Sequence, residues 1–426
     1  MKNKMNERLK NNFKLIVFAF LISIIFLSIM LIKGYTSNGW SLVYFWTIFV
    51  TTFMSSRVIG SIFYKIPSEK DESYNPLITF IIPSKNEEKA IYHTISSCFA
   101  VNYPKKKIEV IAINDGSTDN TLNEMNRAKK DFNNFNLKII NWKINKGKRE
   151  GMIYGFRKAK GEIIIQLDSD SYPDPEGIRY LISPFKDKKI YGVVGHTLPS
   201  NPDTNILTKI QYAYYFMSFR ALKSTESMFD VVFCCSGCYS GYRKNYVVPH
   251  LDKWSQEKFF GKKYSYGDDR SLTNLGLKLG YKTVYSSEAK AFTVVPEKFK
   301  QLYNQQKRWK KGWFINSMKA SRWIYKRDGF VSLTYFFPLI FLTLLTPIIA
   351  IKSLIINPIF YGISPIFYIM GILLISTLCY VHFLIYSPVK KYGKYMFLWS
   401  ILNMTVLSFI LIPALLDLNN TKWVTR

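Results

Sequence analysis

The 426-residue chain has little acidic charge and few cysteines, and each shortage narrows what the protein can be. It carries 58 Lys and Arg residues against 29 Asp and Glu, a formal net charge of +29. Nucleic acid, anionic lipid and an anionic substrate all attract positive charge. The enrichment of Lys and Arg on the cytoplasmic side of membrane proteins explains most of this excess. Of five cysteines, only Cys235 and Cys238 have C-x-x-C spacing. A spaced disulfide framework and the second cysteine pair of a zinc site are therefore both missing.

The sequence also lacks a Walker-type phosphate loop. The Gly-Lys pairs that begin at Gly147, Gly261 and Gly393 are not followed by Ser or Thr. This argues against a nucleoside triphosphatase and leaves a nucleotide-diphosphate donor as the phosphorylated substrate. Internal repeats and low-complexity tracts are absent as well.

Apolar residues make up 48% of the chain and aromatic residues 16%, which is high for a soluble protein and predicts a membrane component. Residues 15–32 carry no charge and are apolar apart from Ser23 and Ser28. They follow a basic stretch and precede no small-residue cleavage pattern. They predict a retained spanning helix with its N-terminus inside, not a removed signal peptide. A second span is expected over residues 40–63, where Arg57 either snorkels toward the inner interface or has a functional role.

Three further apolar segments follow, at residues 331–356, 360–386 and 395–416. The lysine-rich linker before the last segment is typical of a cytoplasmic loop, so the first two form an out-and-back pair. The last segment contains Pro413 and either spans the membrane or lies in its interface. The chain thus divides into two membrane regions, a cytoplasmic domain, an interfacial stretch and a terminal segment. The membrane regions are residues 1–66 and 331–416, and the cytoplasmic domain is residues 67–294. The interfacial stretch is residues 295–330, and the terminal segment is residues 417–426.

The polar middle region alternates strand-like and helix-like patterns. The strand patterns are LITFII, IEVIAI, LKIINW and EIIIQL, and the helices between them are expected from about Glu87, Asp119 and Gly147. This order predicts a doubly wound α/β domain with a parallel sheet, in which ligands bind beyond the carboxyl ends of the strands.

The strongest motif is IIIQLDSD, in which a buried strand runs into Asp168 and Asp170. Residues two apart in a strand share a side, so both carboxylates can point at one site. A hard divalent cation that also keeps diphosphate oxygens needs that geometry, although a solvated strand end remains an alternative.

Two loops after earlier strands carry candidate nucleotide-binding groups. IPSKNEE contains Pro83, Lys85 and Glu87 and can cradle a nucleotide, or it is an ordinary turn with Asn86 as helix cap. NDGSTDNT places Asp115 where it can accept from a base or ribose, or where it forms an Asx turn.

A third loop, NKGKRE, gathers basic residues at a glycine-bearing turn. Its cations are Lys146, Lys148 and Arg149. They suit a diphosphate, and a solvated basic face is the competing interpretation.

Two later motifs carry the groups for transfer and for the acceptor. YSYGDDRSLTN offers Asp268 and Asp269, either as the carboxylate that takes an acceptor proton or as an Asp-Arg pair capping a helix that begins near Ser271. In QQKRWKKGWF, Arg308 can grip phosphate and Trp309 can stack on a sugar ring. An amphipathic helix on the membrane is compatible with both roles.

The ordered set PSKNEE, NDGSTDN, NKGKRE, DSD, GDDRSLTN and QQKRW, bracketed by spanning helices, resembles the processive membrane family 2 glycosyltransferases. Within them the chain looks most like the bacterial hyaluronan synthases. The resemblance runs from the first helix to KWVTR, where that family carries W-G-T-R. It implies a GT-A domain that uses UDP-sugars with Mg²⁺ or Mn²⁺, works at the plasma membrane and extends a growing polysaccharide.

The resemblance also implies individual roles. It places Asp115 on the uridine, Asp170 on the metal with Asp168 beside it, and Asp269 as the general base. Arg308 and Trp309 fall at the diphosphate and acceptor. The terminal Trp423 and Arg426 resemble a segment that closes over the nucleotide.

Cys235, Ser236 and Gly237 match the family's CSGPLS loop beneath the acceptor sugar. The chain departs from the family at three positions. Cys238 stands where proline is usual, Gly312 replaces a serine, and Val424 replaces a glycine. A β-branched residue does not easily take the conformations open to glycine, so Val424 puts the terminal contact in doubt.

If Trp423 reaches a cytoplasmic site, the crossings after the catalytic domain are even in number. Residues 395–416 then lie in the inner interface or re-enter, giving four full spans. The expected product is hyaluronan, made from UDP-GlcNAc and UDP-GlcA and exported through the spanning helices, with membrane lipid around them and no nucleic acid bound. A chitin-like or poly-N-acetylglucosamine synthase, another capsule synthase and an inactive export scaffold are the alternatives.

Overall fold

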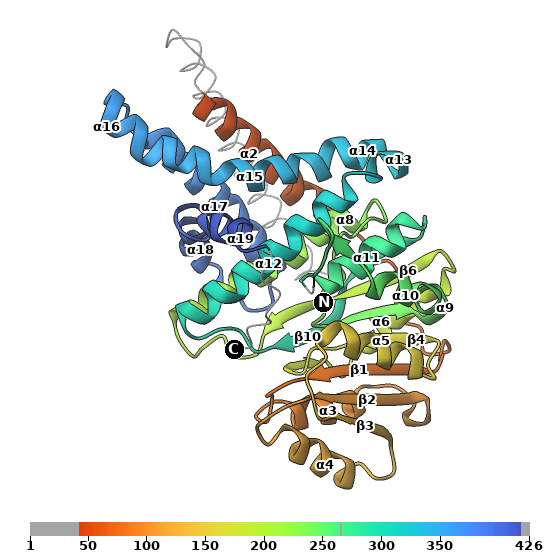
Figure 1. Ribbon diagram of the computed structural model, residues 1–426. Coiled ribbons are helices and arrows are strands. Elements are labelled where there is room, and N and C mark those ends of the chain that lie inside the picture. Colours follow the sequence, from red (N-terminus) through yellow and green to blue (C-terminus); the bar gives the residue numbers. More distant parts are fainter. Residues whose placement is uncertain (1–41, 265, 419–426) are drawn as a thin grey trace, which may run out of the picture.

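The computed structural model describes residues 42–264 and 266–418, and the expected helix at 15–32 lies outside them. Eight strands form one sheet: β1 (Ile78–Ser84), β2 (Ile108–Asp115), β3 (Asn136–Trp142), β4 (Ile163–Gln166), β5 (Ser171–Pro173), β6 (Ile190–Pro199), β7 (Ser240–Arg243) and β10 (Lys282–Thr293). Their spatial order is β3-β2-β1-β4-β7-β6-β10-β5. Figure 1 shows this sheet on the opposite side of the molecule from the long apolar helices.

The first half of the sheet confirms the predicted doubly wound pattern. Strand β1 pairs in parallel with β2 and β4, and β2 pairs in parallel with β3. The second half is mixed, because β7 runs antiparallel to β4 and β6, and β5 runs antiparallel to β10. Strands of three and four residues carry too little periodicity to be read from sequence. The fold is therefore a mixed α/β GT-A-like domain, not a purely parallel sheet.

Helices cover both faces of the first four strands. They are α3 (Ile91–Ala100), α4 (Thr121–Asp131) and α5 (Lys148–Lys158). Alternate residues of β1 belong to different cores: Phe80 packs in the cluster of Ile91 from α3, and Ile81 in the cluster of Phe156 from α5. A strand buried on both faces reads as a continuous apolar run, as LITFII does. The carboxyl ends of the strands stay open between these layers.

The observed helix starts correct two expectations. Helix α3 begins at Ile91, not near Glu87, because Asn86 takes a left-handed φ of 55° and does not cap the helix. Its side-chain oxygen instead accepts the Thr118 backbone N–H at 2.9 Å, which joins the loops after β1 and β2. Helix α5 follows Gly147 as predicted, and Gly147 has a φ of 97° that favours glycine.

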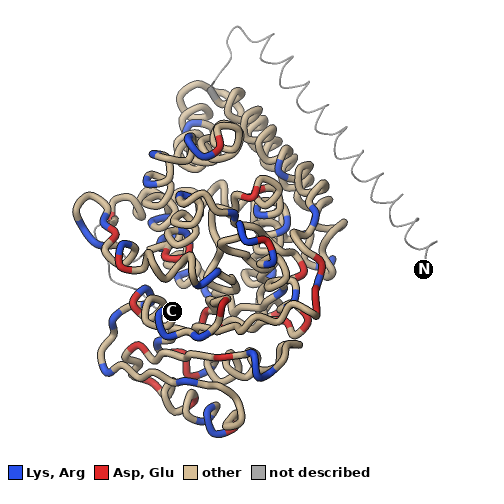
Figure 2. The backbone as a smooth tube through the Cα atoms, turned by 90° about the vertical axis from the view of Figure 1, so that its right-hand side faces the viewer, with Lys and Arg blue, Asp and Glu red and all other residues tan. Residues whose placement is uncertain are grey.

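The rest of the α/β domain consists of short elements. They are α6 (Ile178–Ile182), α7 (Ile206–Met217), the π-helix η3 (Ser218–Lys223), α8 (Ser224–Ser227), α9 (Lys244–Val247), α10 (Leu251–Ser255), the hairpin β8 (Lys258–Phe259) and β9 (Lys262–Lys263), and α11 (Asp268–Lys278). Short 3₁₀ turns are η1 (Lys105–Lys107), η2 (Ser183–Lys186) and η4 (Val248–His250). Helix α11 begins at Asp268, before the expected start near Ser271, because Gly267 in the left-handed region starts it earlier. Charges of both signs alternate along this domain (Figure 2).

The apolar helices begin with α2 (Leu42–Gly60) and resume after α12 (Phe299–Ala320) and α13 (Ile324–Arg327). One continuous helix over Gly329–Tyr361 contains α14 (Gly329–Val331), η5 (Ser332–Phe336), α15 (Phe337–Ile351), η6 (Lys352–Ile356) and α16 (Asn357–Tyr361). After α17 (Ile366–Tyr386) come η7 (Lys390–Tyr392), α18 (Tyr395–Thr405), η8 (Leu407–Ile410) and α19 (Leu411–Leu416).

Two of these helices, Gly329–Tyr361 and α17, are long and apolar enough to cross a membrane. A third candidate is α18 together with Leu407–Leu416, two pieces that meet at 44°. The bend lies at Val406, before Pro413, and it allows either a broken span or a re-entrant loop. The chain thus has two to three membrane-helix candidates among the described residues. The crossing expected of α2, which packs against α17, stays a prediction.

Candidate active site

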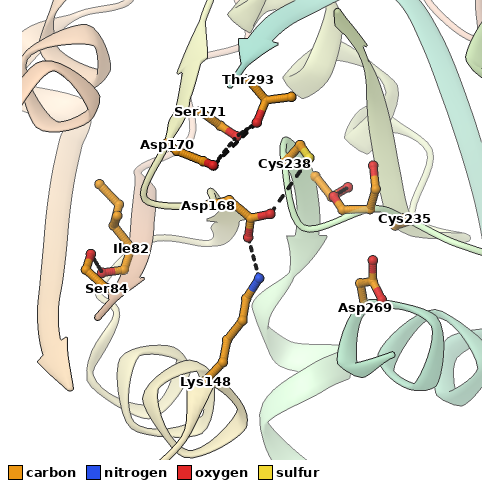
Figure 3. Close-up of polar contacts among 12 residues, drawn as sticks. Ile82, Ser84, Lys148, Asp168, Asp170, Ser171, Cys235, Cys238, Asp269 and Thr293 are labelled. Carbon is orange, nitrogen blue, oxygen red and sulfur yellow. Dashed lines mark hydrogen bonds and ion pairs between the residues drawn. The ribbon is translucent and has the colours of Figure 1, made fainter. Parts of the chain in front are cut away.

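Asp168 and Asp170 lie immediately after β4, at the carboxyl end of the parallel strands. The expectation that both belong to a strand is wrong, because β4 ends at Gln166 and the two residues form a turn. The Ser171 N–H donates to the Asp168 carbonyl at 3.0 Å, and the Thr94 hydroxyl donates to the Ser169 carbonyl at 2.7 Å. The turn, not strand alternation, brings the two carboxylates to one place (Figure 3).

Lys148 pairs directly with Asp168. It is the first residue of α5, and its ammonium group donates to the Asp168 carboxylate (Figure 3). Burial alone would lower the pKa of Lys148, but the charge of Asp168 and the more distant Asp269 outweigh burial and raise it. Lys148 therefore stays a cation at neutral pH, with two further N–H donors available to a ligand.

Asp170 is buried and is held by hydroxyl groups. The Ser171 hydroxyl lies 3.5 Å and the Thr293 hydroxyl 3.3 Å from its Oδ1 atom. Thr293 is the last residue of β10, far away in sequence, and no motif pointed to it. Asp170 thus has an oxygen-rich surrounding that a hard cation can share.

A loop of residues 233–238, here called the cysteine loop, separates the two acidic groups of the site (Figure 3). At one end, Cys238 Sγ lies 3.7 Å from Asp168 Oδ2. At the other end, Cys234 Sγ lies 3.6 Å from Asp269 Oδ2. Burial, and then the charges of Asp168 and Asp170, raise the pKa of the Cys238 thiol well above its usual range. This sulfur therefore stays protonated and can donate to the Asp168 carboxylate.

The predicted acceptor residues Cys235, Ser236 and Gly237 form the middle of the cysteine loop. The Cys235 N–H donates to Thr273 Oγ1 at 2.9 Å, which ties the loop to α11. The Ser236 hydroxyl is buried and has no hydrogen-bond partner within residues 42–264 and 266–418. A Cβ atom on Gly237 would lie 2.8 Å from Asp168 Oδ1, so glycine is needed for this close approach.

The two neighbouring carboxylates at the start of α11 differ in their partners. Asp268 Oδ1 accepts from Arg149 Nε at 2.6 Å, and both side chains are almost fully buried. Asp269 is half-buried, accepts the Arg270 N–H at 2.8 Å and faces the cysteine loop. The Asp-Arg pair suggested by the sequence thus joins Asp268 to Arg149, not to the neighbouring Arg270. The structure does not bring Asp268 and Arg149 into the group around Asp168.

Asp115 holds the basic loop NKGKRE in place through hydrogen bonds to its carboxylate. Its carboxylate accepts the Lys146 N–H at 2.6 Å, the Gly147 N–H at 2.9 Å and the Asn145 side-chain amide at 2.7 Å. Asp115 is buried, whereas the Lys146 side chain is exposed and lies 4.6 Å from the centre of the Trp142 ring. The carboxylate that was predicted to hold a uridine also fixes the loop that was predicted to hold its diphosphate.

The first nucleotide loop lies beside that of Asp115. Pro83 is buried near the end of β1, and Lys85 and Glu87 are half-buried in the loop that follows. The Glu87 N–H donates to Thr121 Oγ1 at 2.8 Å. These contacts join the loops after β1 and β2, and the nucleotide-binding roles stay predictions.

The remaining candidates come from the interfacial helix and the C-terminus. Arg308 and Trp309 lie on α12, where Trp309 is 37% exposed and its ring centre is 6.3 Å from that of Tyr215. Trp423 and Arg426 lie outside the described residues.

A metal site made by protein groups alone is absent from the described residues, since nowhere do three or more His, Cys, Asp or Glu side chains gather suitably. Two hydroxyl groups do lie beside the Asp170 carboxylate, and the Asp168 carboxylate, two residues away, is on Lys148 (Figure 3). Mg²⁺ commonly takes one or two carboxylates and fills its remaining positions with phosphate oxygens and water. The donor set therefore fits Mg²⁺ or Mn²⁺ delivered with a diphosphate, and Asp170 is the candidate residue to hold it.

Sequence reasoning missed two polar groups of the site. Gln166 is completely buried at the end of β4, and neither polar atom of its side chain has a partner within the described chain. Its signal was present, because a glutamine interrupts the apolar run of IIIQLDSD. Thr293 gave no such signal, since only pairing of β10 with β5 brings it to Asp170.

Comparisons with known proteins bear on the family and the fold of the chain. A model of glycosyl transferase family 2 matches residues 79–248. A hyaluronan synthase of Streptococcus pyogenes serotype M1 is 30% identical over 414 residues, covering 96% of each chain. An N-acetylglucosaminyltransferase of Azorhizobium caulinodans is 28% identical over 248 residues, covering 58% of this chain and 62% of its own.

Among solved structures, a mannosyltransferase of Pyrobaculum calidifontis in complex with GDP-Man and Mn²⁺ is similar. Its TM-score is 0.58 at 16% identity, covering 90% of this chain and 100% of the other. At this identity the likeness supports the fold alone. The sequence relatives carry the further conclusion, and the chain belongs to the family 2 glycosyltransferases, with similarity to hyaluronan synthases along nearly its whole length.

Proposed function

We propose that the protein is a processive, inverting glycosyltransferase that polymerises UDP-GlcNAc and UDP-GlcA into hyaluronan and exports it across the plasma membrane. The observation that carries this proposal is the cysteine loop, which contacts Asp168 at one end and Asp269 at the other. A donor site and an acceptor site need such a pair of carboxylates on two sides of one reacting centre. The relative that is 30% identical over 96% of this chain supports the choice of polymer.

Asp269 is the proposed general base. Its half-buried carboxylate takes the proton of the acceptor hydroxyl, whose oxygen then bonds to the anomeric carbon of the donor sugar. The bond from that carbon to the diphosphate breaks on the opposite side, and its electron pair leaves with UDP. Attack in line with the leaving group inverts the anomeric configuration.

The donor diphosphate is proposed to lie over Lys146 and Lys148, with Arg308 closing from α12. Lys148 uses one donor on Asp168 and can direct the others at phosphate oxygens. When bound, Mg²⁺ or Mn²⁺ held by Asp170 neutralises charge that develops on the diphosphate. Asp115 and the loop of Pro83, Lys85 and Glu87 hold the nucleoside end.

The acceptor is proposed to lie on the cysteine loop. The buried Ser236 hydroxyl, which has no partner among the residues that the structure describes, offers a hydrogen bond to a sugar hydroxyl. The exposed part of Trp309 offers a face for stacking at the entrance to the membrane helices. Trp423 and Arg426 keep their predicted role in closing the nucleotide site. A C-terminal tag that reports from outside the cell would contradict that role and the four-span arrangement.

A second candidate changes the polymer and keeps the site. The 28% identical N-acetylglucosaminyltransferase favours a chitin-like or poly-N-acetylglucosamine synthase, which needs UDP-GlcNAc alone. UDP release by purified protein in detergent, with Mg²⁺ or Mn²⁺, separates the two. Sustained release and hyaluronidase-sensitive polymer only with both donors support hyaluronan. Polymer from UDP-GlcNAc alone supports the second candidate, and no release with any UDP-sugar would indicate an inactive export scaffold.

A further inference from the structure

The backbone of the cysteine loop is held by hydrogen bonds to two charged residues, Lys223 of η3 and Glu226 of α8. Lys223 donates to the Cys234 carbonyl, and the Phe233 N–H donates to Glu226 Oε2 at 3.1 Å. These bonds flank the peptide that carries the Cys234 side chain. Since Cys234 Sγ lies 3.6 Å from Asp269 Oδ2, any shift of this peptide moves the thiol against the proposed base.

Glu226 also reaches into the membrane region. Its second oxygen, Oε1, accepts a hydrogen bond from the hydroxyl of Tyr335. Tyr335 belongs to η5, a π-helical turn inside the long apolar helix Gly329–Tyr361. One carboxylate thus joins the backbone of the cysteine loop to a membrane-helix candidate. A π-helical turn within an α-helix is a recurrent feature of functional sites.

Ring packing reinforces the same connection. The Phe233 ring stacks on the Tyr335 ring with centres 5.7 Å apart and planes at 14°. On its other side, Tyr335 lies 4.3 Å from the Arg57 guanidinium of α2, which donates to the Thr334 carbonyl at 2.6 Å. Tyr335 is therefore fixed by two apolar helices, and its position is transmitted to Phe233 through both a hydrogen bond and a stacked ring.

We propose that Glu226 and Tyr335 are positioning residues for Asp269, through which the membrane helices set the geometry of the proton-accepting side of the site. The proposal rests on the proposed role of Asp269 as general base. Both residues act through the Phe233–Cys234 peptide, to which Glu226 is bonded directly and Tyr335 through Glu226. A base displaced by a fraction of an ångström still leaves the donor site intact, so the effect falls on turnover and not on nucleotide affinity.

The test compares Tyr335→Phe with Tyr103→Phe. Both tyrosines are 4% exposed, and Tyr103 donates to the Pro76 carbonyl at 2.6 Å at the far end of the sheet. Both variants lose one buried hydroxyl and keep the ring, so their melting temperatures should fall alike. We expect kcat for polymer formation to fall about tenfold in Tyr335→Phe only, with UDP affinity by calorimetry changed less than about twofold in both.

Glu226→Gln provides a second, independent variant. If Glu226 and Tyr335 act through their shared hydrogen bond, the double variant loses no more kcat than the larger single loss. Equal kcat in Tyr335→Phe and Tyr103→Phe, or fully additive losses, would overturn the positioning role and leave the proposed function standing. A wild-type protein that releases no UDP from any UDP-sugar would overturn both.

Discussion

Two consecutive residues of α5 form ion pairs that differ in burial and in the part of the molecule where they lie. Lys148 pairs with Asp168, where the two side chains are 23% and 26% exposed, and Arg149 pairs with Asp268, where they are 7% and 4% exposed. A helix turns by about 100° per residue, so neighbours in sequence face different surroundings. One pair borders the open site and the other is part of the core.

The consecutive carboxylates Asp268 and Asp269 also face different surroundings. Asp268 turns inward to Arg149, and Asp269, the next residue, faces the cysteine loop. A pair that stays accessible can exchange partners when a diphosphate arrives, whereas a buried pair holds its elements in place. The two halves of a motif such as DD or KR can therefore serve binding and folding separately.

The largest expected effect is a loss of polymer formation when Asp269, rather than Asp268, is replaced. Asp269→Asn keeps the shape of the side chain but cannot take a proton, so polymer formation should fall roughly 10²- to 10⁴-fold. UDP binding, measured by calorimetry, should stay nearly unchanged because the proposed role of Asp269 is on the acceptor side. Loss of UDP binding together with activity would mean that Asp269 serves the donor.

The second prediction breaks the buried pair. Asp268→Asn leaves the Arg149 guanidinium buried without its carboxylate, which should destabilise the fold by about 3–5 kcal/mol. Thermal unfolding in detergent measures this loss. Asp252→Asn is the control, because its pair with Arg157 is largely exposed and its removal should cost less than about 1 kcal/mol. Equal losses in the two variants would contradict the structural role of Asp268.

The third prediction concerns the accessible pair. In Gly237→Ala the added methyl group would lie 2.8 Å from Asp168 Oδ1 and 3.2 Å from Lys148 Nζ, so the pair must shift. We expect roughly tenfold lower kcat/KM for UDP-sugars, since misplaced binding groups weaken transition-state contacts. Gly329→Ala is a suitable control, because nothing lies within 4 Å of its added Cβ. Full activity of Gly237→Ala would show that the Lys148–Asp168 pair tolerates displacement.

Part of this arrangement follows from the sequence. Strands β1 to β4 and the loops after them were predicted because each strand is rich in apolar residues and is followed by a polar loop, as at Asp115 and Asp168. Local chemistry decides such features. Gly147 likewise fixed the start of α5, since its positive φ suits glycine.

The pairing of Arg149 with Asp268 had no local signal. These residues are 119 positions apart, and only the packing of α5 against the start of α11 brings them together. The sequence offered the adjacent Arg270 as an alternative partner of the acidic pair, because proximity along the chain was the only information available. Contacts of Cys234 and Cys238 with carboxylates were missed for the same reason, and the short antiparallel strand β7 places that loop.

The last and smallest effect concerns a third pair of consecutive charged residues, Lys310 and Lys311 on α12. Lys311 is buried and donates to Asp417 at 2.9 Å. Lys310 has no hydrogen-bond or ion-pair partner among the described residues, and burial lowers its pKa to about 8 from 10.5. Lys311→Met should therefore destabilise the protein, because it removes a partner of Asp417, whereas Lys310→Met should stabilise it.

The sign of the Lys310 effect depends on pH. Between pH 8 and 10.5 the unfolded chain binds a proton at Lys310 that the folded protein has released, so wild-type stability rises with pH through this window. Below pH 8 the folded protein carries the full cost of a buried ammonium group. We expect Lys310→Met to be more stable than wild type at pH 7 by on the order of 1 kcal/mol, and the advantage to disappear above pH 10.5. A melting-temperature difference that stays constant from pH 7 to 11 would mean that the gain comes from packing of the methionine and not from the charge.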